Sequence, residues 1–231
     1  MQSPAEWDAR NRILAESMSG LINRFATGRP EAAGRGLDVG CQKGALTDAM
    51  EAQTQFNWTG IDPTIAAPTR SGGGLELLPG TADRLPFEDG TFDVALFANV
   101  YEHVLPELRE ASLADIRRVL TKGGHVIGQI PNPYFPIESH SRLPFMGWLP
   151  IRAQKVYWHL SPVPWEHDFF VVTIRQLRAA AARQGLETLY VRNFNYPAEV
   201  IPRSLRSAWR VMERPMRRMP WAWQFALRRV D

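Results

Sequence analysis

Cysteine is nearly absent from this chain, because Cys41 is the single thiol among 231 residues. One thiol forms neither an internal disulfide nor a zinc cluster of cysteines, so the sequence excludes a disulfide scaffold and a cysteine-based zinc finger. A single thiol also fits the reducing cytosol, where structural disulfides are rare. We therefore predict a cytoplasmic protein with no metal site, and we keep peripheral attachment to the inner face of a membrane as an alternative location.

Long apolar runs are also missing. No uninterrupted apolar stretch approaches the roughly 20 residues that cross a bilayer, and residues 1–8 carry neither the basic nor the apolar region of a signal peptide. The sequence thus predicts a protein that is neither transmembrane nor secreted by a recognisable signal. Its 45% hydrophobic content is enough for one large α/β domain.

Acidic residues are scarce at the end of the chain. In residues 201–231, eight arginines accompany only Glu213 and Asp231, so this segment carries a formal charge of +6 within a chain of +3. We rank packing on the domain or on a second subunit first, an anionic membrane surface second and nucleic acid third as partners of this segment. Four aromatic side chains lie among the arginines: Trp209, Trp221, Trp223 and Phe225.

Strand and helix patterns alternate along the chain. Short apolar runs between turn residues predict strands, and apolar residues at helical spacing predict helices. This alternation predicts an α/β fold with a Rossmann-like, doubly wound, mostly parallel sheet and helices on both faces. The expected strands are 36–39, 56–62, 75–79, 92–98, 125–130 and 186–194, and the expected helices are 5–26, 45–52, 104–120 and 173–184.

The expected domain covers residues 1–200, with 131–169 as an insertion. No segment is a convincing candidate for a final antiparallel strand. Residues 204–214 and 219–229 instead predict two short helices separated by proline. We therefore expect 201–231 to be a basic, aromatic and helical tail.

The stretch 37–46 joins a strand to a helix through Gly40 and Gly44. Glycine permits positive φ and close backbone approach, and the first amides of the following helix are unpaired donors, so this turn predicts a ligand site. Asp38 ends the first strand. Asp62 ends the next strand, where a carboxylate can accept hydrogen bonds from both hydroxyls of a ribose.

Five segments share one order with a known family: Leu-Asp-Val-Gly-Cys-x-x-Gly, Gly-Ile-Asp, Ala-Asp-Arg-Leu-Pro-Phe-Glu-Asp-Gly-Thr-Phe-Asp-Val, Glu-His-Val and Arg-Val-Leu-Thr-Lys-Gly-Gly. Residues 36–194 thereby resemble class I S-adenosylmethionine-dependent methyltransferases, in the type 11-like subgroup that methylates small molecules. The resemblance implies S-adenosylmethionine as the cofactor. It also implies that Asp38, Gly40 and Gly44 surround the methionyl part, Asp62 holds the ribose, Ala82 and Asp83 lie near the adenine, and Asn99 closes the pocket floor.

Two positions depart from the family pattern. Gln42 stands where a third glycine is usual, and Thr81 stands where an acid usually contacts the adenine amino group. The long side chains of Gln42 and Lys43 either point to solvent or weaken the cofactor site. Asp83 is a candidate to replace the missing acid.

A dinucleotide is the competing ligand for such a sheet. Gly-x-Gly-x-x-Gly holds a pyrophosphate, whereas this chain has Gly-x-x-x-Gly with Asp38 where a phosphate would be repelled. A carboxylate instead attracts a sulfonium and an amino group, so the charge of the site favours the methyl donor.

Residues 131–169 are rich in proline and aromatic side chains, which predicts an ordered insertion rather than a helix. The insertion follows a strand at the carboxyl edge of the sheet, so we expect it to be a substrate lid. In-line methyl transfer needs a general base only when the acceptor must lose a proton. His140 with Glu138, or His167 with Asp168, is the candidate base, although a single histidine more often caps a turn.

The expected reaction is methyl transfer to an oxygen of a small-molecule, sugar or lipid-linked acceptor, with nitrogen and carbon ranked behind oxygen. Residues 139–145, Ser-His-Ser-Arg-Leu-Pro-Phe, are similar to an insertion of methyltransferases that act on glycans or lipid-linked sugars. The alternative is a non-catalytic module of the same fold that binds a partner or a membrane surface through its tail. Gln42, Lys43 and Thr81 favour that alternative.

Overall fold

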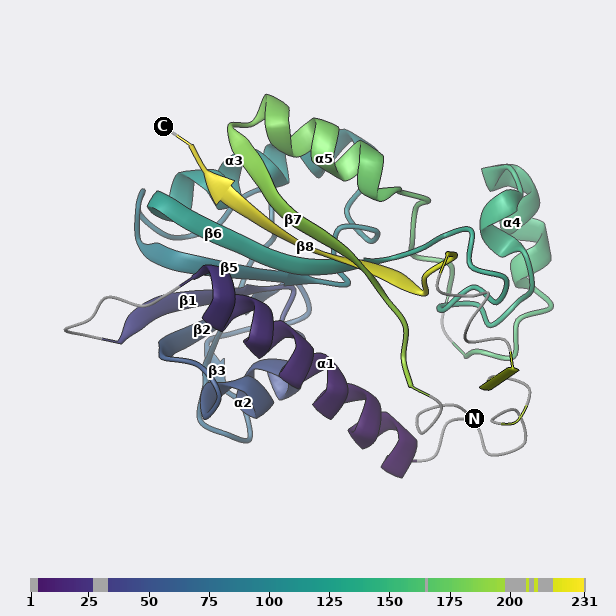
Figure 1. Ribbon diagram of the computed structural model, residues 1–231, viewed down its shortest axis with the longest axis horizontal. Helices are drawn as coiled ribbons and strands as arrows, with labels where there is room; N and C mark the ends of the chain where they lie inside the picture. The colour runs from purple at the N-terminus through teal and green to yellow at the C-terminus, as the bar shows by residue number, and fades with distance from the viewer. Residues whose placement is uncertain are drawn as a thin grey trace.

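The protein is described by a computed structural model covering residues 4–26, 33–164, 166–197, 207, 210, 211 and 218–230. An eight-stranded sheet runs through its centre in the order β3-β4-β2-β1-β5-β6-β8-β7 (Figure 1). Strands β4, β2, β1, β5 and β6 pair in parallel, whereas β3, β8 and β7 join through antiparallel pairs. The strands are β1 Gly34–Val39, β2 Phe56–Asp62, β3 Thr69–Arg70, β4 Glu76–Pro79, β5 Phe92–Ala98, β6 Leu120–Pro131, β7 Leu186–Phe194 and β8 Ala222–Arg229.

Helices cover both faces of the sheet, as expected (Figure 1). Helices α1 Pro4–Phe25 and α2 Ala45–Glu51 lie on one face, and α3 Arg109–Val119 and α5 Ile174–Arg183 lie on the other. A 3-10 turn, Pro106–Leu108, precedes α3. No described helix is both long and apolar enough to cross a bilayer.

The continuous apolar run of β5 follows from this two-sided cover. Val94 and Leu96 belong to the core cluster beneath α1 and α2, while Ala95 and Phe97 belong to the cluster beneath α3 and α5. Successive strand residues point to opposite faces, so a strand covered on both sides needs apolar residues at every position. The structure confirms the predicted strand over residues 92–98.

Strand β8 overturns the expected helical tail. Residues 222–229 lie between β6 and β7 and pair antiparallel with both (Figure 1). The described sheet thus has its final antiparallel strand, and it extends beyond the expected domain end at residue 200. Phe225 is fully buried and Trp223 packs against the same core, so these aromatics stabilise the domain. The predicted helix over 204–214 lies mostly outside the described residues.

The insertion after β6 also differs from the prediction, because it contains a helix. Helix α4, Ile151–Trp158, begins after Pro150, and a 3-10 turn, Met146–Trp148, precedes it. Proline fits the start of a helix, where its missing N–H has no intrahelical partner, so a proline-rich segment does not exclude one. The insertion has its own small core, formed by Leu143, Met146, Trp158 and Phe169.

Candidate functional site

The glycine turn has the backbone geometry that the sequence predicts. Gly40 has φ 80° and Gly44 has φ 77°, both in the left-handed region. The Gly40 N–H donates to the Ile61 carbonyl at 2.8 Å, which ties the turn to β2. A Cβ on Gly40 would lie 2.5 Å from the Val100 side chain, so a larger residue is excluded there by space as well as by φ.

Asp38 lies buried at the end of β1, only 4% exposed. The Thr47 hydroxyl donates to its Oδ2. Burial raises the pKa of Asp38 to about 7; the Thr47 hydrogen bond opposes this rise, and the negative charge of Asp62 adds to it. Because its pKa is close to pH 7, the carboxyl group loses its proton at little free-energy cost when a cation binds beside it. The site therefore fits the ammonium and sulfonium groups of S-adenosylmethionine.

Asp62 is held firmly at the tip of β2. Its Oδ2 accepts from the Gln42 N–H at 2.9 Å, and its Oδ1 accepts from the N–H and hydroxyl of Thr64 at 2.9 and 2.5 Å. A carboxylate offers about four acceptor positions, so one remains for a ribose hydroxyl. The long side chains of Gln42 and Lys43 are exposed.

Asn99 follows β5 with φ 58° and belongs to a polar network that the sequence did not reveal. The Gln129 side chain donates to Asn99 Oδ1 at 3.0 Å, and the Gln224 side chain donates to Gln129 Oε1 at 2.9 Å. Ser17 and Arg192 donate to Gln224 Oε1. The network joins α1, β7, β8, β6 and the end of β5, and it was missed because β8 was taken for a helix.

The two predicted adenine residues lie in the turn after β4. Ala82 packs against the core beneath α3 and α5, and Asp83 is half-buried. The Arg84 N–H donates to the Thr81 carbonyl at 3.1 Å, which closes this turn. The structure therefore places Asp83 one strand away from Asp62, at the same carboxyl edge of the sheet.

A cluster of acids and histidines forms where the lid meets the segment after β5. His140 Nδ1 lies 2.7 Å from Glu138 Oε1, and His140 Nε2 lies 3.9 Å from Glu102 Oε1. His103 Nδ1 lies 3.1 Å from the Asp168 carbonyl and 3.3 Å from its carboxylate. The predicted pairing of His140 with Glu138 is thus present in the geometry.

Burial and charge act in opposite directions on this cluster. Burial raises the pKa of Glu102. Burial also raises the pKa of Glu138, but hydrogen bonds from the His140 ring and from backbone amides outweigh it and bring the pKa to about 2. Burial lowers the pKa of His103, yet the hydrogen bond to Asp168 and the charges of Glu102 and Asp168 raise it to about 9. Glu138 is therefore ionised, whereas burial favours the uncharged form of Glu102.

His167, the other predicted base, is placed differently. Its ring stacks on Phe169, and its Nε2 is buried without a hydrogen bond to any described residue. Burial lowers its pKa. Asp168, its candidate partner from the sequence, contacts His103.

Glu102 and His103 were given no role from the sequence. Their signal was present, since polar residues that closely follow a buried parallel strand lie at the ligand-binding edge of the sheet. Their meeting with His140 depends on the path of the lid, which no local pattern encodes.

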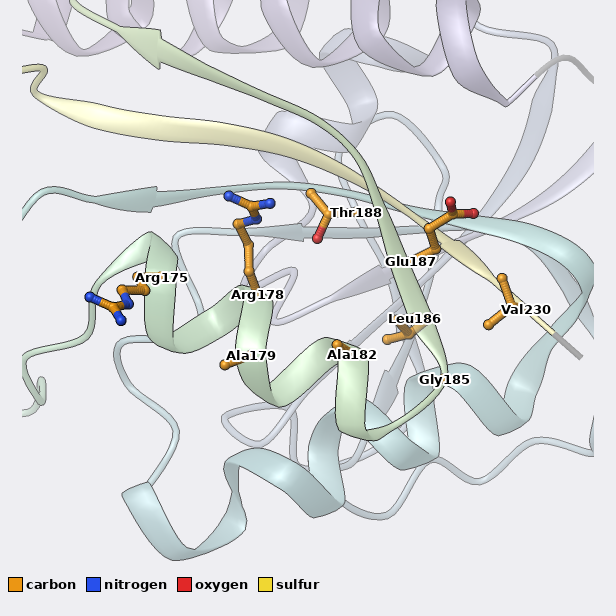
Figure 2. Close-up of a pocket in the computed structure, with 9 residues that line it drawn as sticks. All are labelled: Arg175, Arg178, Ala179, Ala182, Gly185, Leu186, Glu187, Thr188 and Val230. Carbon is orange, nitrogen blue, oxygen red and sulfur yellow. The ribbon is translucent and has the colours of Figure 1, made fainter.

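One hollow in the described structure lies away from these groups. It measures about 450 Å³, lies between α5 and β7 and is lined by Arg175, Arg178, Glu187 and Thr188 among others (Figure 2). Glu187 already pairs with Arg228 at 2.6 Å. The strained turn and the buried acids lie at the carboxyl edge of the sheet, so we place the functional site there.

The fold and the turn together define a Rossmann-like class I methyltransferase, and comparisons with known proteins agree. A family model described as a methyltransferase domain matches residues 10–191. The ubiquinone/menaquinone biosynthesis C-methyltransferase UbiE of Geobacter sp. (strain M21) is 29% identical over 145 residues, which cover 57% of this chain and 61% of that protein. The match therefore spans about three fifths of the length of this curated relative.

Two solved structures are similar over most of their length. An S-adenosylmethionine-dependent methyltransferase from Mesorhizobium loti has a TM-score of 0.60 and 18% identity, and the match covers 98% of this chain and 99% of that one. PH0226 from Pyrococcus horikoshii OT3 has a TM-score of 0.63 and 15% identity, over 94% and 90%. At these identities the likeness shows the fold. The family match shows more: the chain belongs to the methyltransferase domain family.

Proposed function

We propose that this methyltransferase moves the methyl group of S-adenosylmethionine to a hydroxyl oxygen of a small acceptor, with nitrogen and carbon as lower-ranked targets. The cluster of Glu102, His103, Glu138 and His140 carries the proposal, because a hydroxyl must lose its proton during transfer whereas a free amine need not first do so. Of the two candidate bases from the sequence, His140 and His167, we propose His140, oriented by Glu138. The donor's carbon–sulfur bond breaks with its electron pair on sulfur, an oxygen–carbon bond forms, and the acceptor proton is released.

The donor is proposed to lie over the glycine turn. Asp38 faces its cationic methionyl part, Asp62 its ribose, and Asp83 its adenine. Gly40 and Gly44 give the backbone room to approach, and the sequence further predicts Ala82 beside the adenine and Asn99 at the floor. The buried, weakly acidic Asp38 supports this arrangement, because a fixed cation would stabilise its charged form.

Carbon is the second candidate for the methylated atom. The relative from Geobacter is named a C-methyltransferase of ubiquinone and menaquinone biosynthesis, and a quinol ring carbon gains nucleophilicity when a neighbouring hydroxyl loses its proton. The same cluster would serve that reaction. The oxygen and carbon proposals therefore share their machinery and differ in the product.

The lid supports an acceptor that carries an apolar chain. Four of its large apolar side chains are more than half exposed: Phe145 57%, Trp148 57%, Val156 72% and Leu160 71%. Residues 139–164 contain no acid, while Arg142, Arg152 and Lys155 are exposed in the same segment. A basic surface with exposed aromatics suits an anionic membrane, so we propose a lipid-linked acceptor and a membrane contact at the lid.

The test uses S-adenosylmethionine with a ¹³C-labelled methyl group and three acceptors: a phenol, a hydroquinone with a prenyl chain and a sugar. The ¹³C shift of the product separates an O-methyl from a C-methyl group. We expect an O-methyl product from a hydroxyl acceptor, and we expect His140→Asn to lower kcat while His159→Asn, an exposed lid variant, leaves it unchanged. A C-methyl product would replace the oxygen proposal with the carbon one. Donor binding without turnover on all three acceptors would instead favour the non-catalytic module.

A further inference from the structure

Glu102, His103 and His140 bring three metal-binding side chains to one point. Each offers a ligand atom, and the three atoms lie within 4.8 Å of one another. Glu102 and His103 come from the segment after β5, and His140 comes from the lid, so the point lies where the lid closes on the sheet. We infer that these three residues bind one divalent transition-metal cation.

Glu102 is the group that most needs such a partner. Its side chain is 2% exposed, and neither carboxylate oxygen accepts a hydrogen bond from any described residue. An isolated carboxylate in a poorly solvated place is costly, and proteins offset that cost by pairing the charge or by binding it to a metal. The His140 Nε2 atom lies 3.9 Å from Glu102 Oε1, beyond hydrogen-bond reach.

Both histidines are already oriented as metal ligands usually are. The Nδ1 atom of His140 lies against the Glu138 carboxylate, and the Nδ1 atom of His103 lies against the carbonyl and carboxylate of Asp168. In each ring Nε2 is then the nitrogen left for a metal. Ligating histidines nearly always donate their other ring N–H to a carboxylate or carbonyl, which fixes the tautomer and makes the ligand more basic.

The dimensions suit a metal bound through nitrogen and oxygen. Bonds of about 2.1 Å at a tetrahedral angle place two zinc ligands about 3.4 Å apart, and His140 Nε2 is within about half an ångström of that spacing from Glu102. A small hollow of about 10 Å³, room for about one water, is lined by Glu102, Glu138 and His140. Two imidazoles and one carboxylate favour zinc, iron or manganese over magnesium, which prefers oxygen ligands.

The ion would refine the proposed methyl transfer, and only this part of the inference rests on the proposed function. Three protein ligands leave a position open, as in catalytic zinc sites. A hydroxyl bound there has a lowered pKa and releases its proton to solvent before the oxygen attacks the methyl carbon. His140 then acts as a ligand, and the ion takes over its activating role. His103, with a side chain 33% exposed against 17% for His140, marks the more open side.

The experiment measures binding without reference to activity. Purified full-length protein is treated with a chelator, then titrated with Zn²⁺ by calorimetry and with Co²⁺ by visible spectroscopy. We expect about one ion per chain and the d–d absorption of a low-symmetry Co²⁺ site. The Glu102→Gln change should abolish both signals. The Glu138→Gln change removes the carboxylate that orients His140, so it should weaken the affinity for the metal about 10- to 100-fold.

Two controls keep the result interpretable. His159→Asn removes an exposed histidine from the same lid and should bind as the wild type does. Melting curves should show Zn²⁺ raising the Tm of the wild type but not of Glu102→Gln, while the chelated Glu102→Gln protein should melt no lower than the chelated wild type because it lacks a buried acid.

Three results would overturn the inference: no stoichiometric ion, an unchanged Co²⁺ spectrum in Glu102→Gln, or loss of binding in His159→Asn. Methyl transfer is measured separately. If the titrations find no bound ion and methyl transfer still proceeds, the metal site is refuted and the proposed function stands. Stoichiometric binding without transfer would refute the proposed function and leave the metal site standing.

Discussion

Asp38 should make donor binding depend on pH. Its pKa of about 7 means that the carboxyl group is partly protonated at neutral pH, and a cationic donor favours the ionised form. Affinity for S-adenosylmethionine should therefore rise with pH and level off above pH 7, with a slope approaching about tenfold per pH unit on the acidic side. Calorimetry across this range tests the slope. The Asp38→Asn variant should bind the donor weakly and with no dependence on pH. The Glu51→Gln variant, changed at an exposed position of α2, should keep the pH dependence of the wild type.

The same carboxyl group should affect stability with the opposite trend. Its folded pKa of about 7 exceeds its ordinary value of 3.8, so the folded state holds the proton more tightly than the unfolded chain does. Its contribution is fully present below about pH 4 and is lost as pH rises toward 7, by an amount on the order of 4 kcal/mol. The free energy of unfolding in urea, measured for the wild type and for Asp38→Asn, should differ by an amount that declines in this way as the pH rises. A difference that is flat from pH 4 to 7 would contradict the assignment.

Residue positions were predictable where they depend on local chain geometry. Gly40 and Gly44 are needed by one turn, and Asp62 is the last residue of a recognisable strand, so sequence spacing located all three. Glu102 is different, because its burial and its approach to His140 depend on a lid that begins many residues later. An unpaired buried charge is a tertiary property, and the sequence offered only its position after a strand.

Strand β8 shows how a tertiary contact overrides an element's local preference. Its residues include alanine, glutamine, leucine and arginine, all good helix formers, and local preference therefore predicts a helix. Strand β8 forms backbone hydrogen bonds with β6 along one edge and with β7 along the other. The apolar side chains of β8 enter both core clusters. Strand pairing and burial outweigh helix propensity, which amounts to a few tenths of a kcal/mol per residue.

Gln224 makes the importance of this strand testable. Its side chain is fully buried and hydrogen-bonds with Gln129, Ser17 and Arg192. Gln224→Leu would leave buried polar partners unpaired, and each such group costs about 1–3 kcal/mol. We expect urea unfolding to show a loss of at least that size, together with weaker donor binding through Asn99. Gln53→Ala, at the exposed end of α2, should cost little; a similarly small loss for Gln224→Leu would rule out a structural role for the network.

At the scale of the whole molecule, the sheet and the lid face different partners. The sheet is covered by helices on both sides, whereas the lid carries most of the large exposed apolar side chains among the described residues. For residues 201–231 the sequence analysis ranked packing first and an anionic membrane surface second, because arginines and aromatics are adjacent there. Burial of Phe225 in the sheet removes one of those anchors, and the exposed lid residues offer a surface that the sequence had assigned only to substrate.

Vesicle binding can separate a lid contact from general basic charge. Arg152 and Lys155 are exposed on α4, and each cation near an anionic membrane contributes about 1 kcal/mol, or about fivefold in affinity. The double change Arg152→Ser, Lys155→Ser should therefore weaken sedimentation with phosphatidylserine vesicles roughly 25-fold. The matched control, Arg175→Ser with Arg178→Ser, removes the same charge beside the hollow of Figure 2 and should leave binding unchanged. Equal losses in the two double variants would mean that net charge, and not the lid, determines attachment.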